Sequence, residues 1–60
     1  MKYYVRVNED IVKFKTEEAA RLFAYTTLSD DKVKYVEYGV SNFEHWFGNL
    51  PIAVLKNEEA

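Results

Sequence analysis

Residues 2–18, KYYVRVNEDIVKFKTEE, contain the signals for three successive elements of secondary structure, and they decide the fold class. Residues 2–7 alternate between two sides, as expected of a half-buried strand. One of these sides holds Tyr3, Val5 and Val7. Residues 8–10 are typical of a turn, and residues 11–15 resume the alternation. The two strands are therefore expected to form a β-hairpin.

The end of the same stretch predicts the start of a helix. Thr16 supplies a hydroxyl for the N-cap, and Glu17 and Glu18 place acids near the positive end of the peptide dipoles. Residues at helical spacing form the stripe expected to lie against the hairpin: Ala19, Leu22, Phe23 and Thr26. The polar residues 29–31 are expected to end this helix.

The rest of the chain predicts two more strands and a short helix. Residues 32–39 are rich in strand formers and close on a glycine, and Pro51–Lys56 has its proline where a strand tolerates a missing amide. A short helix is expected over residues 41–48, and residues 57–60 are expected to fray. The outline is ββαβαβ. It describes an α+β fold in a single domain, residues 1–60, with a small antiparallel-rich sheet, helices packed to one side, and a strand order that the pattern leaves open.

The size of the chain limits its stability and its chemistry. A domain of 60 residues hides only about 60% of the surface that its unfolded chain exposes, so it needs extra support. The chain has no cysteine, which excludes disulfides and thiolate zinc sites, and His45 with scattered carboxylates predicts no metal site. We expect no cofactor and no enzyme, because so short a chain rarely encloses a pocket of ~300 Å³. Self-association or a protein partner is the favoured support.

Charge and hydropathy narrow the choice of partner and compartment. Ten acids against eight bases give a net charge of −2, which argues against a general affinity for phosphate backbones. No apolar run approaches the ~20 residues of a membrane span. We expect a cytoplasmic protein without a membrane partner.

Residues 41–49, SNFEHWFGN, concentrate aromatic rings, a histidine and a carboxylate in a short segment. Ser41 and Glu44 fit a capping box, and Gly48 can adopt the left-handed conformation that ends helices. Three rings lie on or beside one face of the expected helix: Phe43, Trp46 and Phe47.

This run resembles the Ser-Asp-Phe-Glu-x-x-Tyr-Gly-Asn run of the smallest phage-encoded inhibitors of uracil-DNA glycosylase. The preceding residues 34–38, KYVEY, are similar to the lysine- and tyrosine-rich strand of that family, which bears a single glutamate. The likeness covers residues 34–49. Phe47 stands where the family has tyrosine, and the helix expected within residues 1–28 does not align with the family.

The resemblance implies a protein that blocks the DNA-binding cleft of the glycosylase by imitating DNA. In this family carboxylates stand where phosphates would, and an apolar pocket takes up the side chain that the enzyme pushes into the minor groove. By position, Glu37 and Glu44 would replace phosphates, while Phe43 and Phe47 would line or support the pocket with Trp46 beside them. The family's homodimers imply a second copy as a further partner, although the additional βα portion of this chain could close the pocket within one subunit. No direct contact with nucleic acid is implied.

Plainer interpretations of the same residues stay open. The capping box already explains Glu44, a solvent-facing strand position explains Glu37, and an ordinary core explains the phenylalanines. One alternative function is inhibition of another host DNA-processing enzyme through an aromatic patch. Another is a small single-stranded nucleic-acid-binding module, in which bases would stack on Tyr3, Tyr4, Tyr35 or Tyr38.

Overall fold

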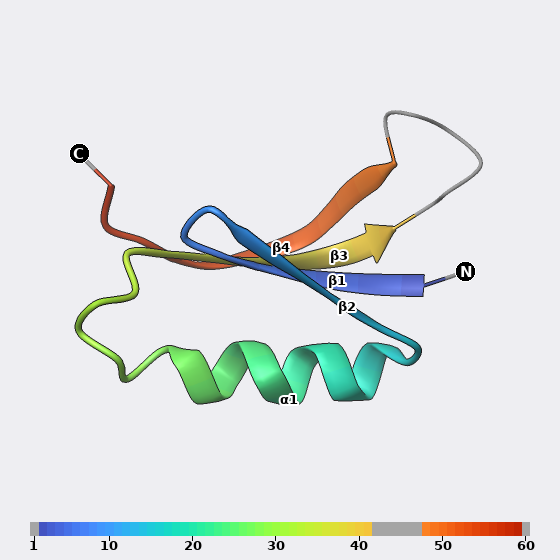
Figure 1. The fold of residues 1–60 in the computed structure, drawn as a ribbon, viewed down its shortest axis with the longest axis horizontal. Coiled ribbons are helices and arrows are strands. Elements are labelled where there is room, and N and C mark those ends of the chain that lie inside the picture. Colours follow the sequence, from blue (N-terminus) through green and yellow to red (C-terminus); the bar gives the residue numbers. More distant parts are fainter. Residues whose placement is uncertain (1, 42–47, 60) are drawn as a thin grey trace.

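The computed structural model describes residues 2–41 and 48–59, which form a four-stranded antiparallel sheet with one helix on one face (Figure 1). The elements in chain order are β1 (Lys2–Val7), β2 (Asp10–Phe14), α1 (Glu17–Thr27), β3 (Tyr35–Ser41) and β4 (Asn49–Asn57). The strand order is β2-β1-β3-β4, and every neighbouring pair is antiparallel. The α+β class and the antiparallel sheet are confirmed. The expected short helix falls largely on residues 42–47, which lie outside the described residues.

The predicted hairpin is confirmed, with β1 ending at the predicted residue. Tyr3 pairs with Phe14 and Val5 with Val12 across the two strands. The two-residue loop that joins them has a positive φ of 56° at Asn8, a conformation that asparagine adopts more readily than most residues.

Helix α1 begins as predicted but presents a different stripe to the sheet. Thr16 Oγ1 accepts a hydrogen bond of 3.1 Å from the Ala19 amide, which is the expected N-cap. Ala20 and Ala24 are fully buried, whereas Leu22 is 67% exposed. The expected stripe is therefore wrong for three of its four members: Ala19, Leu22 and Thr26 are exposed, and Phe23 alone of the four packs on the core. Small alanines on the buried side let the helix pack closely on the sheet.

The core lies between α1 and the face of the sheet toward it. It contains Val5, Val33, Val36 and Tyr38 around the two alanines of α1. The Phe23 ring packs beside it against Phe14, with 5.3 Å between the ring centroids. Within the described residues, no helix is long and apolar enough to span a membrane.

Strand β3 starts later and ends later than the sequence predicts. Asp30 organises a turn instead, because its carboxylate accepts from the Lys32 amide at 2.9 Å and its carbonyl accepts from the Val33 amide at 3.0 Å. At the other end Ser41 pairs with Lys2 of β1 and with Asn49 of β4. Ser41 is thus the last residue of a strand, and its side-chain oxygen accepts from Lys13 Nζ at 2.5 Å.

Strand β4 is longer than predicted and approaches β3 very closely at Gly39. A Cβ on Gly39 would lie 2.2 Å from the Leu50 carbonyl oxygen and 2.7 Å from Pro51 Cα, so only glycine fits. Pro51 lies inside the strand and not at its start, which is tolerated because β4 is an edge strand. Two register shifts in the β3–β4 ladder accompany the visible bend of β4 (Figure 1).

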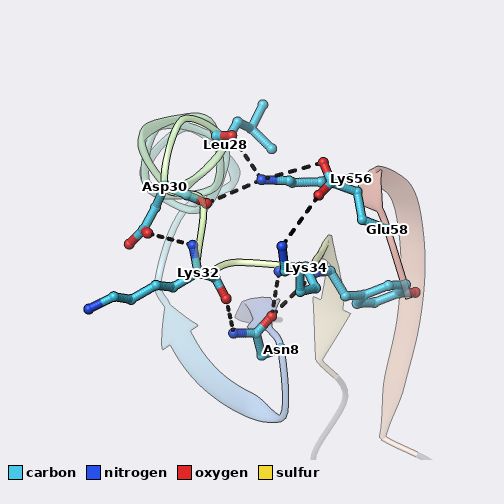
Figure 2. Close-up of polar contacts among 8 residues, drawn as sticks. Asn8, Leu28, Asp30, Lys32, Lys34, Lys56 and Glu58 are labelled. Carbon is cyan, nitrogen blue, oxygen red and sulfur yellow. Dashed lines mark hydrogen bonds and ion pairs between the residues drawn. The ribbon is translucent and has the colours of Figure 1, made fainter. Parts of the chain in front are cut away.

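Asn8 ties the β1–β2 loop to the segment before β3 (Figure 2). Its side-chain amide donates to the Lys32 carbonyl at 3.2 Å, and its Oδ1 accepts from the Lys34 amide at 2.7 Å and the Tyr35 amide at 3.3 Å. One side chain therefore satisfies two backbone groups of the connection and one at the first residue of β3.

Lys56 of β4 binds backbone carbonyls at the C-terminal end of α1, whose own last turn contains no basic residue. Its Nζ donates to the Leu28 and Asp30 carbonyls, both at 3.2 Å, and lies 3.7 Å from a Glu58 carboxylate oxygen (Figure 2). The Glu58 amide also donates to the Lys34 carbonyl at 2.7 Å. The expectation that the tail frays from residue 57 is wrong for Asn57 and Glu58, because strand pairing and these bonds hold them.

Candidate protein-binding face

The face of the sheet opposite α1 carries the one predicted site residue that the structure describes, Glu37. Residues that pair directly across neighbouring strands lie on the same face. Arg6 pairs with both Ile11 and Glu37, and Glu37 pairs with Val54. We call these four residues, together with Tyr4 and Tyr35, the Glu37 face.

Two tyrosine hydroxyls hold the Glu37 carboxylate. Tyr4 donates to Oε2, and Tyr35 donates to Oε1 at 2.5 Å. Tyr4 comes from β1 and is almost fully buried, whereas Tyr35 lies two residues before Glu37 on β3 and is half-buried. The carboxylate is therefore fixed by neutral donors from two strands.

Both phenols are held in the protonated form that can donate. Burial, followed by the hydrogen bond to Glu37, raises the pKa of Tyr4 far above its ordinary value. The hydrogen bond to Glu37, followed by burial, raises the pKa of Tyr35. A phenol beside a carboxylate loses its proton less easily because two negative charges would then meet.

Arg6 faces Glu37 across β1 and β3 but is engaged elsewhere. Its Nε donates to the Asn8 carbonyl at 2.8 Å, and its guanidinium carbon lies 4.7 Å from the centroid of the Tyr35 ring. Between the described Arg6 and Glu37 there is no ion pair. Since a carboxylate offers about four acceptor positions, the described residues leave two of them for a partner, and none of the described cations forms an ion pair with Glu37.

The Glu37 face mixes apolar and basic residues, with Val54 beside Glu37 on β4 and, on its other side, Arg6 on β1 followed by Ile11 on β2. Val54 and Ile11 are 51% and 47% exposed. Strand pairing places Lys2 and Lys13 on this face as well as Arg6, so in the described strands Glu37 is its one acid.

Four of the five predicted site residues lie in residues 42–47, outside the described part of the chain: Phe43, Glu44, Trp46 and Phe47. The structure does describe the residues that flank them. Ser41 and Asn49 pair directly at the end of the β3–β4 ladder, and Ser41 lies on the same face as Glu37. The described residues on either side of this segment therefore meet at the end of the ladder that carries Glu37.

No protein-family model, curated protein or solved structure matches this chain.

The structure adds three residues to the candidate site, Tyr4, Arg6 and Tyr35, none of which sequence reasoning assigned to it. The tyrosines were considered as stacking platforms and not as donors to Glu37. Tyr35 and Glu37 are two residues apart on a strand and so share a face. This spacing alone could have indicated that the two side chains lie close together. Tyr4 and Arg6 reach Glu37 only through the β1–β3 pairing, which the sequence left open.

A second surface feature lies on the far side of the molecule. An open hollow on α1 is lined by Glu17, Glu18, Arg21, Leu22 and Tyr25. The sheet separates it from Glu37. In residues 2–41 and 48–59 no three histidine, aspartate or glutamate side chains gather as a metal site.

Proposed function

We propose that this chain is a protein inhibitor of uracil-DNA glycosylase that occupies the enzyme's DNA-binding cleft. Glu37 takes the place of one DNA phosphate and Glu44 that of another. Phe43, Trp46 and Phe47 form or support the apolar recess that receives the side chain which the enzyme inserts into the minor groove.

The observation that carries the proposal is the way in which two hydrogen bonds hold the Glu37 carboxylate. Its carboxylate is fixed by Tyr4 and Tyr35, and its cross-strand neighbour Arg6 is held away from it. Enzymes grip DNA phosphates with backbone amides, hydroxyls and cationic side chains, all of which donate hydrogen bonds. A fixed anion on which the described residues leave acceptor positions open suits such donors, since a charge-assisted bond is about twice as strong as a neutral one.

The apolar neighbours of Glu37 also suit a protein partner. Val54 lies directly opposite Glu37 and is half exposed, so the charge adjoins apolar surface that binding could bury. A standard interface of ~1,600 Å² can reach nanomolar affinity, while charges at the rim mainly speed the encounter.

The nucleic-acid-binding alternative receives less support from the tyrosines. Tyr3 and Tyr38 pack on the helix side of the sheet, and Tyr4 is 1% exposed. Tyr35 carries the Arg6 guanidinium over its ring. Base stacking requires exposed rings, and these four are covered or partly covered. An inhibitor of another DNA-processing enzyme would use the same face and differs only in its target.

The test is a uracil-excision assay on a single-uracil oligonucleotide with purified glycosylase and increasing amounts of this protein. We expect activity to fall linearly and to vanish near one equivalent of active protein. Glu18→Gln serves as a matched control, because Glu18 is an exposed acid on α1 across the sheet from Glu37. Full excision at a large excess of folded protein contradicts the proposal; parallel assays on a nuclease and a polymerase then test the alternative target.

A further inference from the structure

We infer that Tyr35 is a positioning residue for Glu37, and that Arg6 acts on Glu37 through Tyr35 and not as its counterion. The inference rests on the proposed function, because it assigns these residues a role in presenting Glu37 to the enzyme.

A continuous set of contacts supports this role. The Tyr35 hydroxyl donates to Glu37 Oε1 at 2.5 Å, and the Arg6 guanidinium lies over the Tyr35 ring at 4.7 Å. Asn8 fixes both partners, since its carbonyl accepts from Arg6 Nε at 2.8 Å and its Oδ1 accepts from the Tyr35 amide at 3.3 Å. The tyrosine is therefore held at its backbone, on its ring and at its hydroxyl.

The consequence for binding follows from side-chain entropy. A free glutamate samples several rotamers and must give up that freedom when it enters an interface. The bond from Tyr35 removes part of that freedom in the unbound protein. The Arg6–Tyr35 contact also uses the cation that would otherwise neutralise Glu37.

Tyr35 is a better probe than Tyr4 because it is less buried. The Tyr4 side chain is almost inaccessible, so its loss would disturb packing as well as the bond to Glu37. Tyr35→Phe removes one hydroxyl at a half-buried position, where water can replace it on Glu37. Tyr25→Phe is the matched control, since Tyr25 is a 53% exposed tyrosine on α1.

The experiment is a double-mutant cycle read by the inhibition constant against purified glycosylase. We expect Tyr35→Phe to weaken inhibition about tenfold in the wild-type background and less than about twofold in the Glu37→Gln background. Tyr25→Phe should change inhibition in neither background. Circular dichroism and thermal melting of each variant confirm that the compared proteins are folded.

The outcomes separate the two proposals. If the wild type inhibits and Tyr35→Phe has the same effect in both backgrounds, Tyr35 acts independently of Glu37 and the inference is wrong. An unchanged inhibition constant for Tyr35→Phe also overturns it. If the wild type does not inhibit at all, the proposed function fails, and the inference that rests on it fails with it.

Discussion

Arg6 and Glu37 lie directly opposite each other on β1 and β3 without forming an ion pair. Opposite charges at such positions commonly attract each other across a sheet. Here the Arg6 guanidinium contacts the Tyr35 ring and donates to the Asn8 carbonyl. The Glu37 carboxylate accepts from the hydroxyls of Tyr4 and Tyr35 instead. Among the described residues, the negative charge of Glu37 is therefore held by neutral donors and makes no ion pair.

Replacement of Glu37 by glutamine should slow association with the glycosylase, chiefly at low salt. The anion is expected to steer the encounter, and salt screens steering. We expect the association rate constant to fall about threefold to tenfold at low ionic strength and to approach the wild-type value at high salt. Surface-based kinetics at two salt concentrations measure this, with Glu18→Gln as control. An equal loss at both concentrations would show that steering is not the role of Glu37.

Replacement of Phe47 by aspartate should abolish inhibition. The proposal puts Phe47 in or behind the apolar recess, where an unpaired charge would be desolvated at high cost. The control is Leu22→Asp, since Leu22 is 67% exposed on α1 and its replacement should leave inhibition intact. A folded Phe47 variant that inhibits normally means that the pocket is assigned to the wrong residues.

Replacement of Gly39 by alanine should destabilise the fold strongly. The added methyl group would meet backbone atoms of Leu50 and Pro51, which cannot rotate away as a side chain can. We expect a loss of about 3 kcal/mol in the free energy of unfolding, at the upper end for overpacking. Urea denaturation measures it, and an unchanged midpoint would refute the close approach of β4.

Replacement of Lys56 by methionine should destabilise the protein, whereas replacement of Lys34 should not. Lys56 donates to two carbonyls at the end of α1 and its side chain is 13% exposed, so its loss should cost about 1 kcal/mol. Lys34 contacts the same Glu58 at 3.9 Å, but its side chain is 57% exposed, and such pairs contribute little. Equal melting temperatures for the two variants would show that Lys56 does not hold the helix end.

Replacement of Glu37 by glutamine should also lower the pKa of Tyr35 toward its ordinary value. The carboxylate raises this pKa by favouring the protonated phenol, and a neutral amide cannot do so to the same degree. NMR of the assigned tyrosine ring carbons at alkaline pH follows the titration. A Tyr35 curve that is unchanged in the variant would contradict the hydrogen bond.

The raised pKa values of Tyr4 and Tyr35 predict how the free energy of unfolding depends on pH. Tyr4 and Tyr35 have a higher pKa in the folded protein than the ordinary value of 10.0, so their stabilising contribution is complete below about pH 10. It is lost as the pH rises from there through the folded-state pKa, because the unfolded chain releases these protons first. The free energy of unfolding should therefore fall more steeply above pH 10 in the wild type than in Glu37→Gln. Parallel curves for the two proteins would exclude this coupling.

Local signals predicted most of the fold. The alternation of residues 2–7 fixed β1, and Thr16 fixed the start of α1, because both depend on residues close together in the chain. The stripe of α1 was predicted from the three- and four-residue spacing around Leu22 and Phe23, but the residues of α1 that are fully buried against the sheet are Ala20 and Ala24. The end of β3 was missed because Ser41 pairs with Lys2, a contact between residues that lie far apart in the sequence.

The candidate site was less predictable for the same physical reason. Glu37 was found through a resemblance in its own segment, but its bond to Tyr4 joins residues 33 positions apart. That contact depends on which strand lies beside β3, and alternation alone does not determine strand order. Arg6 was unassigned because its role depends on the position of the Tyr35 ring, which the same pairing sets.

The most direct measurement is a competition experiment with a fluorescently labelled DNA duplex bound to uracil-DNA glycosylase. If this chain occupies the DNA-binding cleft, one equivalent should lower the fluorescence anisotropy to that of free DNA. An anisotropy that stays constant, or rises because a ternary complex forms, would contradict the claim that the protein stands in the place of DNA.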